Sequence, residues 1–213
     1  MRVAVGLLTF NRFHLLQRTL RTLQDRADYP FDLVLVDGGS ESQAQRDYVQ
    51  AAGGECLSIP TVGASMNVVI DRCLRLEPDL VVFTADDYDF KDAWLRNLVA
   101  FWRTAPSDVA LCCLNWEPRY KWNTVLEKLN VGGQQVLIRQ TLPGSSWSFR
   151  SSDWQLIGPI EAKTGGEDLT VARRLQENGR RLAALDLTIH TGERESAWGN
   201  HSWKQAKPLE ISV

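Results

Sequence analysis

The chain has 213 residues, 44% of them hydrophobic and 23% charged, and it carries a formal net charge of −2 at pH 7. This composition is typical of a soluble globular protein with one full core and excludes a largely disordered chain; the charge provides no global attraction for nucleic acid or acidic membranes. No apolar stretch approaches the ~20 residues that span a bilayer and the first residues lack a signal-peptide layout, so we expect no transmembrane segment and a cytoplasmic location.

In chain order, the first half alternates strands with helices. Residues 2–8 form an apolar run that predicts a strand, and apolar residues at helical spacing over residues 13–23 predict a helix that Asn11 could cap. Strands that alternate with helices favour a mostly parallel sheet with right-handed crossovers. The further elements predicted in this half are strands over residues 33–36, 55–59 and 79–84 and helices over residues 41–52 and 65–76.

The second half has a less regular pattern. Residues 116–130 are aromatic and charged and fit no element, and residues 191–213 are expected to form a lid or a tail. A helix over residues 167–178 follows the 3.6-residue period and ends at Gly179. The other elements predicted here are a helix that starts at Trp94, strands over residues 109–114, 134–138 and 146–150, and a final strand over residues 182–190.

An acidic cluster follows the apolar run of residues 80–83. Parallel sheets bind ligands outside the carboxyl ends of their strands, and carboxylates crowded at that edge need a cation or hydrogen bonds to compensate their charge. Hard oxygen ligands suit Mg²⁺ or Mn²⁺, which bridge protein carboxylates to phosphates. The alternative is an ordinary turn or helix cap. We expect that capping role for Asp89 and Asp92, before the helix at Trp94, and a metal-binding role for Asp86.

Four motifs occur in the order and spacing of a known family, each after a predicted strand or at the start of a helix. Together with His190 in the last strand, they resemble an inverting family 2 glycosyltransferase of the nucleotide-diphosphosugar transferase type, over residues 1–190. The four motifs are Thr9-Phe-Asn-Arg12, Asp37-Gly-Gly-Ser-Glu-Ser42, Thr84-Ala-Asp-Asp87 and Gly165-Gly-Glu-Asp168.

The resemblance implies an α/β, Rossmann-like nucleotide-diphosphosugar transferase (GT-A type) fold, with a mostly parallel central sheet flanked by helices. It implies one glycosyltransferase domain over residues 1–213, with a nucleotide-sugar-binding half (1–105), an acceptor-binding half (106–190) and the C-terminal lid or tail. The implied reaction moves a sugar from a nucleotide-diphosphate donor, expected to be a UDP-sugar, to an acceptor hydroxyl with inversion.

On the donor side, the resemblance implies a pocket for the nucleotide at the strand ends. Asp37 corresponds to the acid that accepts the nucleobase N–H, typically N3–H of uracil, in a charge-assisted hydrogen bond. The alternative for Asp37 is a turn residue before Gly38. Asn67 corresponds to a helix start near the nucleotide sugar, although Met66 replaces the usual arginine. The implied donor-binding residues are Thr9, Asn11, Arg12, Asp37, Ser40, Asn67, Thr84 and Asp86.

The resemblance also implies a divalent metal, Mn²⁺ or Mg²⁺. Family members usually carry an aspartate where this chain has Thr84, and Asp86 corresponds to the second aspartate, which ligates the metal. His190 corresponds to a histidine that is sometimes a third ligand; its alternative is a structural residue at a strand end. Because Thr84 replaces the first aspartate, a lower metal affinity and a metal-independent reaction are both open.

The implied catalytic residues are Asp168 and its neighbour Glu167. Inverting transfer needs a general base that takes the proton from the attacking acceptor hydroxyl, and the resemblance assigns this role to Asp168. Two acids at a helix N-terminus are also ordinary partners of the helix dipole. The preceding Gly165 and Gly166 favour the catalytic interpretation, because glycine allows close approach of a substrate.

Two other functional classes are compatible with parts of the sequence. A nucleotidyltransferase would need a Gly-rich loop with Lys or Arg after the first strand, and residues 6–12 lack it. A non-catalytic sugar- or nucleotide-binding module is compatible with Thr84 in place of the usual aspartate. The acceptor is unknown: a glycan, a small molecule, a protein or modified DNA. The DNA alternative, glycosylation of hydroxymethylated bases, rests on aromatic and cationic residues at 119–122 and 198–207, although tryptophan also stacks on sugars.

Overall fold

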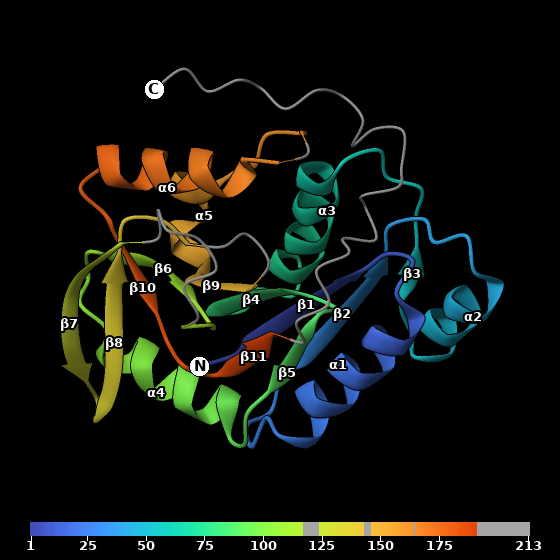
Figure 1. Cartoon of the computed structure of the whole chain (residues 1–213), viewed down its shortest axis with the longest axis horizontal. Coiled ribbons are helices and arrows are strands. Elements are labelled where there is room, and N and C mark those ends of the chain that lie inside the picture. The colour runs from blue at the N-terminus through green and yellow to red at the C-terminus, as the bar shows by residue number, and fades with distance from the viewer. Residues whose placement is uncertain (117–123, 143–145, 164, 191–213) are drawn as a thin grey trace.

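The chain folds around a nine-stranded sheet with helices on both faces, as the computed structural model in Figure 1 shows. The structure describes residues 1–116, 124–142, 146–163 and 165–190. The strands are β1 Val3–Thr9, β2 Asp32–Asp37, β3 Glu55–Cys56, β4 Leu80–Ala85, β5 Tyr88–Phe90, β6 Val109–Cys113, β7 Val125–Val131, β8 Gln134–Arg139, β9 Ser146–Arg150, β10 Arg181–Ala184 and β11 Thr188–His190. The helices are α1 Phe13–Asp25, α2 Gln43–Ala51, α3 Val62–Leu74, α4 Trp94–Thr104, α5 Trp154–Ile157 and α6 Glu167–Glu177.

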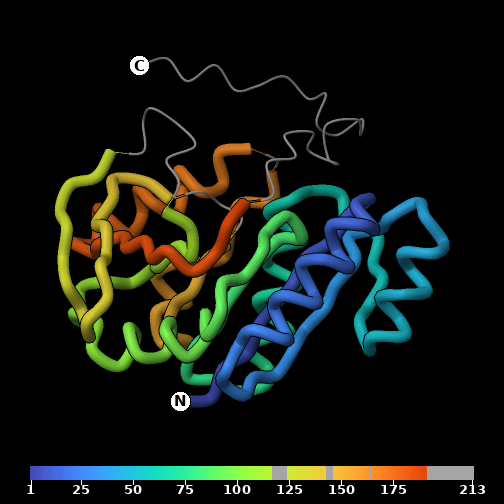
Figure 2. Tube along the Cα trace, turned by 60° about the horizontal axis from the view of Figure 1, so that its bottom comes forward, coloured from blue at the N-terminus to red at the C-terminus, as the bar shows by residue number. Residues whose placement is uncertain are grey.

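The large sheet is mixed, with the strand order β3-β2-β1-β4-β9-β6-β10-β8-β7. Its first four strands are mutually parallel, and β9 is antiparallel to both of its neighbours, β4 and β6. The β7–β8 hairpin and α2 therefore lie at opposite ends of the molecule, as Figure 2 shows.

Strand β1 is buried on both faces, which explains why its sequence is a continuous apolar run. Val3 and Val5 face the cluster that contains α4, whereas Ala4 and Leu8 face the cluster of α3, α5 and α6. Gly6 lies under α3: a Cβ at this position would come within 2.3 Å of the Val69 side chain. The glycine thus lets α3 pack close to the sheet.

The register of the parallel strands places three loop starts side by side. Thr9 at the end of β1 pairs with Asp37 at the end of β2, and Leu8 pairs with Ala85 at the end of β4. The acidic residues that follow β4 therefore lie at the same sheet edge as the residues that follow β1. This arrangement is the one that the alternation of strands and helices predicts.

The prediction of one final strand over residues 182–190 is wrong, because this segment contains parts of two strands, β10 and β11. Strand β10 ends at Ala184, and β11 leaves the large sheet to pair antiparallel with β5, where His190 lies opposite Tyr88. This ladder joins segments about a hundred residues apart, so no local periodicity indicates it. Strand β7, which overlaps the segment that the sequence pattern left unassigned, and β5 were likewise not predicted.

Two predicted helix caps are also wrong. Asn11 does not cap α1: the N-cap position is Arg12, and the Asn11 side chain accepts a hydrogen bond from Glu41 instead. Asp89 and Asp92 do not cap α4, whose N-cap is Ala93 in the left-handed conformation. Asp89 lies in β5 and bonds to Arg18, and Asp92 forms an ion pair with Arg26. Arginine partners thus take the place of the expected capping bonds. None of the helices in the described parts of the chain is long and apolar enough to cross a membrane.

Candidate functional site

The carboxyl ends of β1 and β4 are joined by a buried hydrogen-bond chain. The hydroxyl of Thr9 donates to Asp86 Oδ2 over 2.6 Å, and Gln45 Nε2 of α2 donates to that hydroxyl over 2.9 Å. The hydroxyl of Thr19, in α1, lies 2.9 Å from the carbonyl oxygens of both Asp86 and Tyr88. Gln45 and Thr19 thus hold the predicted site residues in place through hydrogen bonds. No sequence motif indicated that Gln45 and Thr19 belong to the site.

The acidic pair lies beside an arginine and a histidine. As whole residues, Asp86 and Asp87 are only 4% and 7% exposed. Arg12 Nη1 lies 3.0 Å from Asp87 Oδ2 and 3.5 Å from Asp86 Oδ1. His190 Nε2 lies 3.0 Å from Asp87 Oδ2, so the structure brings His190 to Asp87. Arg12, the acidic pair and His190 come from three separate segments of the chain, and the structure brings them together. The sequence analysis named all four, three of them within motifs and His190 in the last predicted strand.

Burial controls the protonation of Asp86. Desolvation raises the pKa of Asp86 to about 7, with a further contribution from Asp87, while Arg12 and the Thr9 hydroxyl oppose this rise. One guanidinium therefore only partly compensates the two carboxylates.

Asp37 closes the turn that follows β2. Its Oδ1 accepts hydrogen bonds from the backbone N–H groups of Gly39 (2.9 Å) and Ser40 (2.7 Å). Its Oδ2 is buried and has no hydrogen-bond partner among the described residues. Asp37 is fully buried, so a nucleobase would reach Oδ2 only after the residues around it move. The turn role and a free acceptor oxygen thus coexist in one side chain.

The loops after β1 and β2 hold one another. The backbone N–H of Asn11 donates to Ser40 Oγ over 2.8 Å, and Asn11 Oδ1 accepts from the N–H of Glu41 over 2.9 Å. Asn11 adopts a φ of 52°, a left-handed conformation that asparagine tolerates better than most residues. The predicted donor residues Asn11, Ser40 and Asp37 are therefore parts of one connected loop pair.

Thr84, the predicted substitute for the first aspartate of the acidic motif, lies inside the sheet. It is fully buried between Leu7 of β1 and Ser146 of β9, and its hydroxyl donates to the carbonyl of Ala85 over 3.1 Å. In this position, Thr84 supports the end of β4, two residues before Asp86.

Asn67 joins the two halves of the chain. Its Nδ2 donates to the carbonyl of Ile160 over 2.7 Å and its Oδ1 accepts from the N–H of Ile160 over 2.9 Å. The N–H of Gly63 donates to the carbonyl of Lys163 over 3.0 Å. The start of α3 thus holds the segment that leads to α6. This two-way amide pairing was not part of the sequence prediction for Asn67.

The substitution Gly63→Ala is expected to disturb this contact. A Cβ at residue 63 would lie 1.9 Å from the carbonyl oxygen of Glu161, and a backbone atom cannot turn aside as a flexible side chain can. We expect a loss of about 1–3 kcal/mol in the free energy of unfolding, measured by thermal or urea unfolding. Ala64→Ser, at the next and less buried position, is the control. A Gly63→Ala protein with unchanged stability would mean that α3 does not hold the segment.

The predicted catalytic pair opens α6. Asp168 Oδ1 accepts a hydrogen bond from the N–H of Leu169 over 2.9 Å. The Glu167 carboxylate is largely buried, which raises its pKa, and its Oε2 has no hydrogen-bond partner within the described ranges. Among the described residues, no hydrogen bond or ion pair joins Glu167 or Asp168 to Asp86. The predicted site residues therefore form two groups. The group predicted to bind the donor lies at the strand ends, and the predicted catalytic pair lies at the start of α6.

A divalent cation fits the group at the strand ends only in part. The described segments contain no cluster of three or more His, Cys, Asp or Glu side chains placed to hold an ion. Asp86 and Asp87 nevertheless offer carboxylate oxygens, and Asp87 Oδ1 is buried with no hydrogen-bond partner there. Mg²⁺ is commonly held by one or two carboxylates together with substrate phosphates and water, and this donor set matches that pattern.

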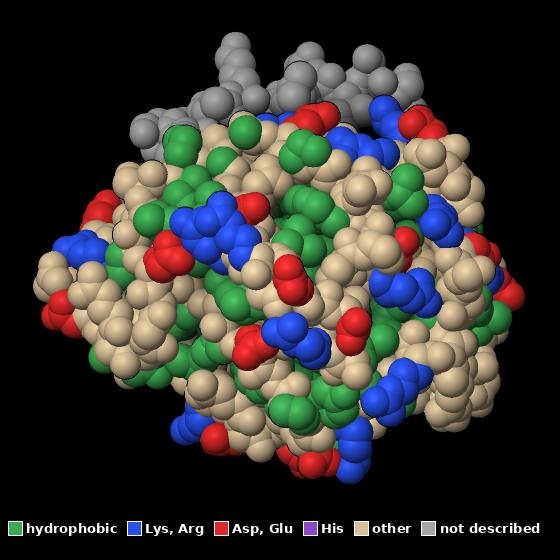
Figure 3. All heavy atoms as spheres, turned by 180° about the vertical axis from the view of Figure 1, so that it is seen from behind, with side chains coloured by type: hydrophobic (Ala, Val, Ile, Leu, Met, Phe, Trp, Pro, Cys, Tyr) green, Lys and Arg blue, Asp and Glu red, His purple; other side chains and the backbone are tan. Residues whose placement is uncertain are grey.

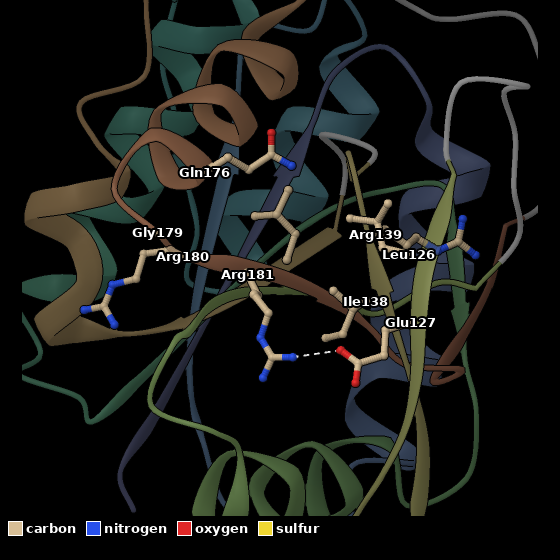
Figure 4. A pocket seen from close by; sticks show the side chains of 9 residues that line it. Leu126, Glu127, Ile138, Arg139, Gln176, Gly179, Arg180 and Arg181 are labelled. Carbon is tan, nitrogen blue, oxygen red and sulfur yellow. Dashed lines mark hydrogen bonds and ion pairs between the residues drawn. The ribbon is translucent and has the colours of Figure 1, made fainter.

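A separate cavity of about 480 Å³ opens around the start of β10 (Figure 4). Arg180 and Arg181 line it together with Gln176 of α6 and Glu127 of β7, which accepts a hydrogen bond from Arg181. Because β10 runs in the same direction as β4, its start lies at the sheet edge opposite to the acidic pair. None of the predicted site residues lines this cavity, so it lies outside the candidate site.

Comparisons with known proteins agree with this architecture. The family model described as glycosyl transferase family 2 matches residues 4–145. No curated protein matches the chain. Among solved structures, the mannosyltransferase PcManGT from Pyrobaculum calidifontis, in complex with GDP-Man and Mn²⁺, has a TM-score of 0.66 at 16% identity, over 91% of this chain and 58% of that one.

Two further structures have the same TM-score of 0.66. GalNAc-T7 with UDP, GalNAc and Mn²⁺ is 11% identical over 88% of this chain and 43% of its own. S. aureus TarS in complex with UDP-GlcNAc is 17% identical over 94% of this chain and 61% of that chain. This chain therefore spans about half the length of such structures. The implied GT-A type fold, with mostly parallel core strands flanked by helices, is confirmed.

Proposed function

Because the chain belongs to glycosyl transferase family 2, we propose that it transfers a sugar from a nucleotide-diphosphate donor to an acceptor hydroxyl, with inversion at the anomeric carbon. The observation that carries this proposal is the meeting of Thr9, Arg12, Asp86, Asp87 and His190 at the carboxyl ends of parallel strands, where such sheets bind ligands. Membership of this family argues against the nucleotidyltransferase alternative.

The proposed donor is a UDP-sugar. The solved structures in the comparison hold either UDP or GDP compounds, so the base must be chosen from this chain's own residues. Asp37 has one carboxylate oxygen, Oδ2, with no hydrogen-bond partner among the described residues. Uracil presents a single N–H donor at N3, which one oxygen can accept, whereas guanine presents both N1–H and a 2-amino group. A single acceptor oxygen therefore favours uracil.

The substitution Asp37→Asn tests the donor proposal. The asparagine oxygen can keep the turn to Gly39 and Ser40, but its amide then presents N–H groups toward the base in place of the acceptor Oδ2. We expect at least a tenfold loss of UDP affinity in calorimetry, which corresponds to ~1.4 kcal/mol. Asp32→Asn, at the exposed opposite end of β2, is the control. Unchanged UDP affinity of the Asp37 variant would remove Asp37 from the site.

We further propose that Mn²⁺ or Mg²⁺ binds with the donor diphosphate at Asp86 and Asp87. Two of the compared structures contain Mn²⁺. When bound, such an ion would neutralise charge on the diphosphate leaving group. His190 would either ligate the ion directly or orient Asp87 through their hydrogen bond. Retention of full transfer activity in excess EDTA would defeat this part of the proposal.

The acceptor is proposed only as a hydroxyl compound. The segments that motivated modified DNA, residues 119–122 and 198–207, lie outside the described residues. On the face shown in Figure 3, basic and acidic side chains alternate and form no single basic patch. A glycan array, together with DNA that contains hydroxymethylated bases, would separate the acceptor classes. Hydrolysis of UDP-sugars, with and without Mn²⁺, would separate an enzyme from a non-catalytic binding module.

A further inference from the structure

The Arg12 guanidinium lies against both carboxylates of the acidic pair. Its side chain is only 12% exposed, and those of Asp86 and Asp87 are 5% and 11% exposed. Charges removed from water in this way interact more strongly than charges at the surface. The hydrogen bonds of Asn11 to Ser40 and Glu41 fix the backbone of the loop that carries Arg12. The fixed backbone keeps the side chain of Arg12 close to the two carboxylates.

The oxygens that Arg12 contacts are those that a second cation would need. Asp86 Oδ2 already accepts a hydrogen bond from Thr9, which leaves Oδ1 as the oxygen that faces Arg12. Asp87 Oδ2 contacts both Arg12 and His190, while Asp87 Oδ1 has no hydrogen-bond partner in the described part of the chain. A divalent ion that bridged the two carboxylates would therefore lie next to the guanidinium and be repelled by it.

We propose that Arg12 is the resident counter-cation of the Asp86–Asp87 pair and that it prevents a divalent cation from binding there without a diphosphate. This inference rests on the proposed function for the identity of that diphosphate. The diphosphate of a nucleotide adds negative charge, which can compensate the guanidinium and the metal ion together. Arginine suits this exchange, because its planar guanidinium donates to carboxylate and phosphate oxygens with similar geometry. Metal and nucleotide should then bind cooperatively.

The test measures the binding of Mn²⁺ by electron paramagnetic resonance, first to the protein alone and then in the presence of UDP. The wild-type protein should bind Mn²⁺ alone weakly and bind it at least about tenfold more tightly with UDP. Arg12→Gln, which removes the charge, should bind Mn²⁺ alone at least about tenfold more tightly than the wild type. Arg12→Lys keeps the charge and should remain weak.

Arg18→Gln is the matched control. Arg18 lies in α1, the helix that begins after Arg12, and pairs with Asp89 rather than with Asp86 or Asp87. Removal of its charge should leave Mn²⁺ binding unchanged. The proposal is wrong if Arg12→Gln binds Mn²⁺ alone no better than the wild type, or if the wild type binds Mn²⁺ equally well with and without UDP.

Two comparisons keep the result interpretable. If Arg12→Gln does not fold, Arg12→Met, which also removes the charge, replaces it in the same titrations. If UDP does not bind to the wild type at all, the proposed function fails, whereas the titration of wild type and Arg12→Gln with Mn²⁺ alone still decides the role of Arg12.

Discussion

The substitution Asp168→Asn is expected to lower the rate of sugar transfer by about 10²–10⁴-fold, while the protein stays folded and still binds UDP. The asparagine keeps the size of the side chain and can still accept the hydrogen bond that Asp168 Oδ1 receives from Leu169. It cannot take a proton from an acceptor hydroxyl. The measurement is the rate of transfer with saturating donor, together with the anomeric configuration of the product by nuclear magnetic resonance.

Glu177→Gln, an exposed substitution at the other end of α6, should transfer at the wild-type rate. Glu167→Gln is the more informative comparison, because Glu167 is a second carboxylate at the start of α6, and burial raises its pKa and so makes it more basic. A large loss of transfer in Glu167→Gln, with near-normal transfer in Asp168→Asn, would assign the base to Glu167. A product that retains the donor's anomeric configuration would remove the base role altogether.

The second large effect concerns stability, and we expect it to have the opposite sign from the effect on activity. In the metal-free protein, Asp86→Asn should raise the free energy of unfolding at pH 8 by about a few kcal/mol, at 1.36 kcal/mol per pKa unit, while transfer is lost. The pKa of Asp86 is raised to about 7 mainly by burial, whereas that of an unfolded aspartate is near its model value of 3.8. Ionisation of Asp86, which prevails at pH 8, therefore costs more free energy in the folded protein than in the unfolded chain.

The sign of the pH dependence follows from proton binding. Between about pH 4 and pH 7 the folded protein holds a proton on Asp86 that the unfolded chain releases, so the wild type should lose stability as the pH rises through this window. Urea unfolding in EDTA from pH 5 to pH 8 should show a shallower decline for Asp86→Asn. Asp92→Asn, whose side chain is 93% exposed, is the control with the wild-type slope. Parallel curves for wild type and Asp86→Asn would contradict the burial of a charge that Arg12 only partly compensates.

The strand ends could be predicted from the sequence because short-range patterns define them. Continuous apolar runs, which are typical of strands buried on both faces, indicated β1 and β4. The parallel register of these strands then placed Thr9, Asp37 and Asp86 at one edge of the sheet. The periodic helices α1, α3 and α6 were predicted for the same reason. Local pattern and global fold agree at these positions.

The features that the sequence did not predict lie where a contact joins distant parts of the chain or where the backbone adopts an unusual conformation. His190 approaches Asp87 because β11 pairs with β5, and Asn67 bonds to Ile160 across 93 positions. Neither pairing leaves a local signal in the sequence. Ala93 has a φ of 56°, which alanine seldom adopts, so the start of α4 was assigned to aspartates that bond elsewhere.

The bond between Asn67 and Ile160 has a consequence for protein engineering. Family 2 transferases would be natural parents for chimeras in which the acceptor-side segment of one protein is exchanged for that of another. Here the segment before α6 is docked on α3 by Gly63 and Asn67, which belong to the other half of the chain. A graft of residues 158–168 alone would separate the new segment from the two residues that receive it. Positions 63 and 67 should therefore be transplanted with the segment, as one discontinuous unit.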